Sequence, residues 1–114
     1  MNYFDLSRWF IEVYKSKIRY KKTLAIDEKV SGTEHPDTAT TYNNMGEVYR
    51  KQGDYDKALE YYGKALAIYE MVLGNELPLT ALAYNNIGVV YDKQNDYDKA
   101  LEYYGKSLAI YEKV

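Results

Sequence analysis

The chain has 114 residues, about the length of one domain, and 46% of them are apolar against 28% charged, an ordinary composition for a folded globular protein. It contains no cysteine and one histidine, which excludes disulfide scaffolds, thiol nucleophiles and zinc sites built from cysteines or histidine pairs. The formal net charge of −2 argues against a dedicated nucleic-acid binder, because such a protein gains affinity by neutralising phosphates.

A single long helix is predicted over about residues 4–30, because neither proline nor glycine interrupts this stretch. Several large apolar side chains fall near one face of it: Leu6, Phe10, Val13, Tyr20 and Leu24. Residues 15–22 hold five basic residues in eight, a pattern also found in helices that contact anionic membranes, nucleic acid or a partner helix. The favoured interpretation is the degenerate second helix of a partial repeat, and contact with a membrane or nucleic acid through 15–22 is the weaker alternative.

Targeting and membrane-spanning signals are missing from the sequence. No apolar run approaches the roughly 20 residues that a membrane span requires. Charged residues (Asp5, Arg8 and Glu12) interrupt any signal-peptide core. We therefore expect a cytoplasmic protein that binds neither membranes nor nucleic acid.

An internal repeat dominates the rest of the chain. Residues 40–72 recur as 82–114 with 25 of 33 positions identical, and the same offset of 42 residues pairs 23–39 with 65–81. The single domain, 1–114, therefore divides into an N-terminal segment (1–35), one repeat (36–77) and a second repeat (78–114) that ends after its second helix.

The first helix of the repeat is predicted from about Pro36 to Gln52. Its apolar stripe recurs at three- and four-residue spacing: Tyr42, Met45, Gly46 and Tyr49. Gly53, replaced by Asn95 in the copy, ends the helix because both residue types accept a left-handed backbone. Asp54 and its copy Asp96 are predicted to cap the next helix.

The second helix of the repeat is predicted to run to about Leu73. Its inward positions are Ala58, Leu59, Tyr62, Ala65, Leu66 and Tyr69, and in the copy Ala100, Leu101, Tyr104, Ser107, Leu108 and Tyr111. Gly46 and Gly88 lack a Cβ on the buried stripe, so we expect a close helix contact there, with Ala58 and Ala100 as the small residues opposite.

These residues resemble the tetratricopeptide repeat (TPR) signature. The matching positions are Tyr42, Met45, Gly46, Tyr49, Ala58, Tyr62, Ala65 and Pro78, and in the copy Tyr84, Ile87, Gly88, Tyr91, Ala100 and Tyr104. The 42-residue period and the stretches 32–39 and 52–55 resemble the variety typified by kinesin light chain. The resemblance implies an all-α, TPR-like solenoid of helical hairpins, with about two and a half repeats in a right-handed superhelical stack. It also implies a non-catalytic scaffold that binds a protein or peptide in the concave groove of the first helices.

Polar and exposed positions of the first helices are the candidate groove residues. They are Asn43, Asn44, Glu47 and Arg50 in one repeat and Asn85, Asn86, Val89 and Asp92 in the next. Asparagine suits this task because its amide both donates to and accepts from an extended peptide backbone, and Asn43 and Asn85 are the leading pair. The alternative is that these asparagines cap or bridge neighbouring helices as part of the repeat.

No catalytic or metal chemistry is expected. The carboxylate clamp of lysine, arginine and asparagine that the family is best known for is absent, because Glu47 and Val89 follow Asn43 and Asn85 by one turn. His35 is interpreted as a structural turn residue, since no partner for a nucleophile or base stands near it. The acids that begin the second helices need no metal to explain them, so no metal site, cofactor or enzymatic activity is expected.

Self-assembly is the alternative function. The last helix carries apolar residues on an outer face that no later segment of the sequence covers, and repeat arrays usually cap such faces. We expect homo-oligomers or a domain-swapped dimer, with another copy covering this face. The expected contacts are Phe10 and Val13 from the N-terminal helix, and Tyr103, Tyr104, Leu108 and Tyr111 from the last one.

Overall fold

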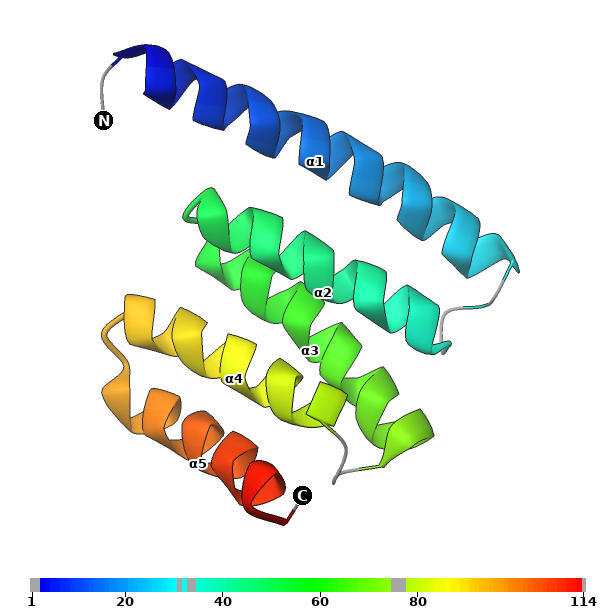
Figure 1. The fold of residues 1–114 in the computed structure, drawn as a ribbon, viewed down its shortest axis with the longest axis vertical. Coiled ribbons are helices and arrows are strands. Elements are labelled where there is room, and N and C mark those ends of the chain that lie inside the picture. The colour runs from blue at the N-terminus through cyan, green and yellow to red at the C-terminus, as the bar shows by residue number, and fades with distance from the viewer. Residues whose placement is uncertain (1–2, 31, 33–34, 75–77, 114) are drawn as a thin grey trace.

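A computed structural model describes residues 3–30, 32, 35–74 and 78–113, and these residues form five helices and no strand. The helices are α1 (Tyr3–Val30), α2 (Pro36–Lys51), α3 (Tyr55–Leu73), α4 (Pro78–Lys93) and α5 (Tyr97–Lys113). α2 with α3 and α4 with α5 form two stacked antiparallel hairpins, and α1 lies along α2 (Figure 1). The predicted all-α repeat fold is confirmed.

The hairpin turns follow the predicted chemistry. α2 ends at Lys51, one residue earlier than expected. Gly53 has φ +77° and Asn95 has φ +63°, so both adopt the left-handed backbone that ends the first helix. A carboxylate oxygen of Asp54 accepts a hydrogen bond from the backbone N–H of Lys57 at 3.3 Å, which confirms the helix cap.

His35 caps α2. Its Nδ1 accepts a hydrogen bond from the backbone N–H of Asp37 at 3.0 Å, and Pro36 occupies the first helical position, where its missing N–H costs nothing. The structural role predicted for this histidine is confirmed.

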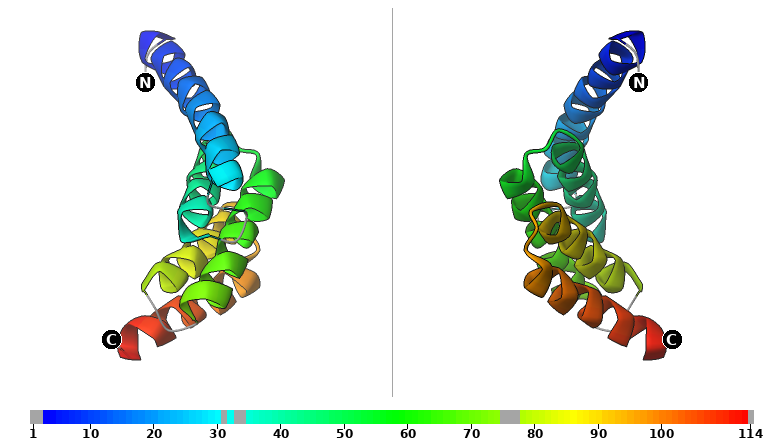
Figure 2. Two further views of the ribbon diagram at one scale, coloured as in Figure 1. Left: turned by 90° about the vertical axis from the view of Figure 1, so that its right-hand side faces the viewer. Right: turned by 90° about the vertical axis from the view of Figure 1, so that its left-hand side faces the viewer.

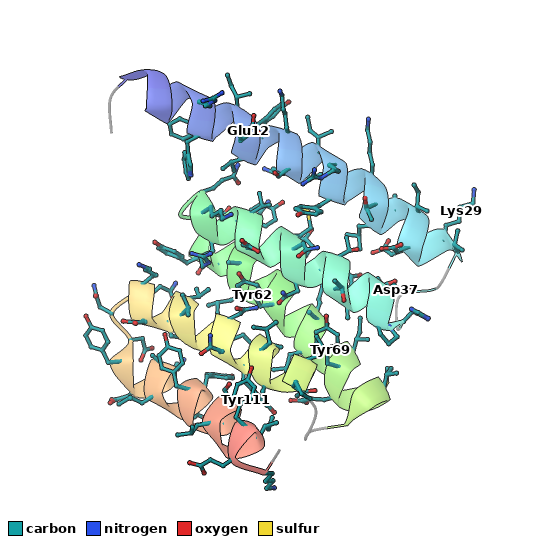
Figure 3. All side chains as sticks on the ribbon, in the orientation of Figure 1. Glu12, Lys29, Asp37, Tyr62, Tyr69 and Tyr111 are labelled. Atoms are coloured by element: carbon teal, nitrogen blue, oxygen red, sulfur yellow. The ribbon has the colours of Figure 1, made fainter. Side chains whose placement is uncertain are left out.

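Tyr62 lies at the centre of the core, enclosed by α2, α3 and α4 (Figure 3). A Cβ built on Gly46 would lie 2.6 Å from Cδ1 of Tyr62, and one on Gly88 would lie 2.8 Å from Cδ1 of Tyr104. The side chain nearest to Gly46 is thus Tyr62, whereas Ala58, predicted to lie opposite, is fully buried in the same core cluster. The glycine makes room for the flat face of a tyrosine ring, which fills the space far better than an alanine methyl group.

Tyrosine hydroxyls tie each second helix to the following first helix. The hydroxyl of Tyr42 donates to Oε1 of Glu28 at 2.8 Å, and Tyr84 repeats the bond to Glu70 at 2.5 Å. Burial, and then the neighbouring glutamate, raise the pKa of both Tyr42 and Tyr84 to about 12. Both tyrosines therefore act as neutral hydrogen-bond donors at physiological pH.

α1 is one uninterrupted helix, as predicted, and it is longer than α3 or α5. Val13 is only 7% exposed, and Tyr20 and Leu24 pack against the core. Phe10, placed near the same face by the sequence, is 56% exposed. The first turns of α1 extend beyond the hairpins (Figure 2). The side chain of Leu6 lies outside the described residues.

α5 differs from α3 although their sequences are nearly the same. Ala100 and Ser107 are buried as predicted, but Leu101, Leu108 and Tyr111 are exposed, so their predicted inward orientation was wrong. The equivalent residues of α3 are covered by α4, whereas no helix in the described part of the chain covers this face of α5.

Candidate protein-interaction surface

Two asparagines join α2 to α4 across the layer of first helices. Nδ2 of Asn86 donates to Oδ1 of Asn43 at 2.9 Å. Both side chains are half-buried, and each amide uses only one of its two polar atoms in this bond. Asn43 and Asn86 therefore bridge neighbouring helices, as the alternative interpretation held, and their remaining amide atoms are left for another partner.

The structure divides the groove candidates into two groups. Asn44 and Glu47 face a cavity of about 170 Å³ between α1 and α2. Its lining residues are Trp9, Glu12, Val13, Ser16 and Tyr20 from α1, and Asn44, Glu47, Val48 and Lys51 from α2. The remaining candidates, which do not line this cavity, are Asn43, Arg50, Asn85, Asn86, Val89 and Asp92, and they belong to the adjoining surface of α2 and α4.

Opposite charges stand at equivalent positions of this surface. Arg50 of α2 interacts with Tyr62 and partly offsets the rise that burial causes in the pKa of that tyrosine. Asp92 of α4 has an oxygen 3.5 Å from the hydroxyl of Tyr104, whose pKa is raised by burial and then by the Asp92 carboxylate. Arg50 and Asp92 thus place a positive and a negative side chain at equivalent positions of α2 and α4, and Glu47 adds an acid beside Arg50.

Lysines cover the tyrosines of each complete hairpin, a feature that the sequence interpretation missed. Lys57 lies over the ring of Tyr49 at 5.4 Å, and Lys64 lies over Tyr42 at 5.5 Å. Lys99 and Lys106 repeat both contacts with Tyr91 and Tyr84 at 5.3 and 5.6 Å. Their recurrence at the 42-residue offset could have revealed these pairs.

The residues expected to contact a second copy differ in accessibility. Phe10, Leu108 and Tyr111 are exposed, and Figure 3 places Tyr111 on the outermost helix. Val13 is buried against α2, so its side chain is not accessible to a second copy. Tyr104 is half-buried over Gly88.

The ring of Tyr103 stacks on that of Tyr91 within the hairpin, with the ring centroids 5.6 Å apart, so we no longer count Tyr103 among the contacts to a second copy.

Two kinds of site are not found among the described residues. No helix there is both long enough and apolar enough to cross a membrane. No group of three or more acidic or histidine side chains in that part of the chain is arranged to hold a metal ion.

Paired helices of one pattern, stacked so that each hairpin covers the last, define a helical repeat protein of the scaffold class. A family model described as tetratricopeptide repeat matches residues 13–71 and, overlapping them, 37–113. The chain belongs to the tetratricopeptide repeat family, whose members are generally protein-interaction scaffolds.

Solved structures share this fold. The chain is similar to BtubC (BKLC) from P. vanneervenii, with 28% identity, a TM-score of 0.87, and coverage of 95% of this chain and 42% of that one. It is also similar to a putative kinesin light chain with TPR-like repeats from Podosopora anserina, with 21% identity, a TM-score of 0.80, and coverage of 96% and 53%. The TPR domain of Arabidopsis FLU matches with 22% identity, a TM-score of 0.78, and coverage of 90% and 83%.

This chain thus spans about half the length, or less, of the first two of these proteins. Among proteins with curated functions, none matches it.

Proposed function

We propose that this chain is an interaction module that binds an extended peptide segment across α2 and α4. The Asn43–Asn86 bridge carries the proposal, because it presents an amide donor (Nδ2 of Asn43) and an acceptor (Oδ1 of Asn86) side by side. An extended peptide offers backbone C=O and N–H groups that can pair with this donor and this acceptor. We also assign Asn85, half-buried one residue earlier on α4, to the proposed peptide-binding surface as a third amide.

The charges of the surface favour one orientation of the bound peptide. Arg50 favours an acidic side chain over α2, and Asp92 favours a basic one over α4. The preferred ligand is therefore a segment of mixed charge, and an entirely acidic tail would meet repulsion from Asp92.

Selection from a display library of random twelve-residue peptides tests this proposal. Peptides that bind the wild-type chain are expected to lose about tenfold in affinity to the Asn85→Ala variant, measured by fluorescence anisotropy. The unfolding free energy should stay unchanged, because Asn85 does not take part in the helix bridge.

Asn86→Ala breaks the bridge, so it should weaken binding of the same peptides and also cost about 1 kcal/mol of stability, which distinguishes it from Asn85→Ala. Selected peptides that bind Asn85→Ala and the wild type equally well would contradict binding at this surface. So would a selection that yields no binding peptide at all.

A second candidate function is head-to-tail self-association. Five α5 residues follow the four- and three-residue spacing of a helix-pairing seam: Tyr97, Leu101, Tyr104, Leu108 and Tyr111. Leu101 is 69% exposed. α1 carries an exposed apolar stripe of its own, made of Phe10, Ile11, Tyr14 and Ile18. Burying one stripe against the other would remove both from water.

Light scattering at tens of micromolar tests self-association. The wild type is expected to form oligomers, and the pairs Leu101→Glu with Leu108→Glu on α5, and Tyr14→Glu with Ile18→Glu on α1, should each give monomers. An equimolar mixture of the two variants should recover a dimer, because each supplies the end that the other lacks. Met71→Glu, an exposed apolar position on α3, is the control and should leave the oligomer intact. A monomeric wild type, or no dimer in the mixture, contradicts the idea.

A further inference from the structure

α1 has the register of a second helix, but no first helix of its own packs against it among the described residues. At the 42-residue offset its residues align with those of α3 and α5, and the family match begins at residue 13, which is equivalent to the first residue of α3. In α3, the flank that faces its own first helix is completely packed, with Ala58 and Ala65 buried and Ile68 6% exposed. On α1, Ile26 is equivalent to Ile68, yet it is 61% exposed.

The preceding residues do not turn back to fill this flank. In the complete repeats, residues 52–54 and 94–96 form the turn between the two helices of a hairpin. The equivalent residues 10–12 are helical, so α1 runs straight on and leads the chain away from its own flank (Figure 1). A helix in that position must therefore come from elsewhere.

We call this surface the helix slot. It is lined by Lys15, Ser16, Tyr20, Lys22, Thr23 and Ile26 on α1 and by Asn44 and Lys51 on α2. The cavity of about 170 Å³ lies at the junction of its two walls. A hollow of about 380 Å³ extends along α1, lined by Lys15, Ile18, Arg19, Lys22, Thr23 and Ile26.

We propose that the helix slot binds a helix from a partner chain that carries the pattern Tyr-Asn-x-x-Gly-x-x-Tyr. The complete hairpins show what each position of the slot would contact. They therefore specify the chemistry of the occupant as well as its location.

Tyr20 sets the position of the glycine. Its equivalents Tyr62 and Tyr104 lie flat against Gly46 and Gly88 of the first helix, so closely that no Cβ fits. A partner helix beside Tyr20 needs a glycine at that point for the same reason.

Lys15 and Lys22 set the positions of the two tyrosines. Their equivalents Lys57 and Lys64 lie over Tyr49 and Tyr42, which are seven residues apart, and the second hairpin repeats both contacts. No ring contact of Lys15 or Lys22 is found among the described residues, whereas two tyrosines of a partner helix at this spacing would supply both.

Asn44 sets the position of the asparagine. Its equivalent Asn86 donates to Asn43, the residue that follows the first tyrosine of the preceding first helix. An asparagine at the same point of the partner helix would accept the equivalent bond from Asn44. The slot thus specifies four residues of the bound helix through contacts that also occur within the two hairpins.

Fluorescence anisotropy with a labelled peptide of residues 36–53, which contains this pattern, tests the proposal on the full chain. Saturable binding is expected, and a Gly46→Val peptide should bind about tenfold more weakly, because its side chain would collide with Tyr20. Ile26→Asp in the protein should weaken binding to a similar degree, and circular dichroism should show an unchanged fold because Ile26 is exposed.

Two control variants separate the slot from the other surfaces. Leu108→Asp on α5 and Asn85→Ala on α4 should leave binding unchanged, so failure of the proposed peptide groove would not affect this result. The proposal is overturned if the peptide does not bind, or if the Gly46→Val peptide binds equally well. It is also overturned if Leu108→Asp abolishes binding while Ile26→Asp does not, since the peptide would then sit on α5.

Discussion

Gly46→Ala is expected to lower the free energy of unfolding by about 3 kcal/mol, the upper end of the cost of overpacking a core. The new Cβ would lie within 3.0 Å of three ring atoms of Tyr62, at 2.6, 2.7 and 2.9 Å. That ring is 2% exposed and packed on both sides, so it has nowhere to move. Urea unfolding followed by circular dichroism measures the loss.

Two other glycines provide a graded control. Gly63→Ala introduces a Cβ with nothing within 4 Å, so it should raise stability by up to about 1 kcal/mol through helix propensity. The change in unfolding free energy for Gly88→Ala should lie between those for Gly46→Ala and Gly63→Ala, because Tyr104 is half-buried and can shift. If Gly46→Ala and Gly63→Ala changed stability in the same direction and to the same extent, the close contact with Tyr62 would be refuted.

Tyr62→Ala is expected to cost about 3–5 kcal/mol, the usual loss for deleting a fully buried aromatic side chain. The ring lies against Gly46 of α2 and shares one core cluster with Ile87 and Val90 of α4, so its removal leaves a cavity between the two hairpins. Thermal unfolding should show a large fall in melting temperature.

Tyr104→Ala is the matched control, because it removes the same side chain from the same repeat position. Its ring packs on Gly88, and no later helix covers it within residues 78–113, so about half the loss is expected. Equal losses for the two variants at a concentration where the protein is monomeric would mean that the two rings are equally buried, contrary to the structure.

The sequence by itself determined the local structure. The left-handed residues Gly53 and Asn95, and the cap at Asp54, set where helices end and begin through backbone and side-chain preferences that act within a few residues. The repeat at the 42-residue offset also predicted two hairpins, because nearly identical sequences favour the same local structure. These features needed no knowledge of which helix covers which.

The site was only partly predictable. The sequence places Asn43 and Asn86 among the groove candidates and allows them to bridge neighbouring helices, yet it does not show that they bond to each other. The cavity that takes Asn44 and Glu47 depends on the path of α1, which propensity alone does not set.

Only the tertiary structure decided the environment of each repeated residue. Leu59 and Leu101 occupy the same position of the same pattern, yet one is partly buried in the core and the other is exposed. Thr38 and Thr80 are fully buried, and their hydroxyls donate to the carbonyls of Gly32 and Gly74 in the connectors before α2 and α4, which the sequence did not predict. Periodicity identifies the apolar face of a helix, but burial requires a second element, and that element comes from a distant part of the chain or from another molecule.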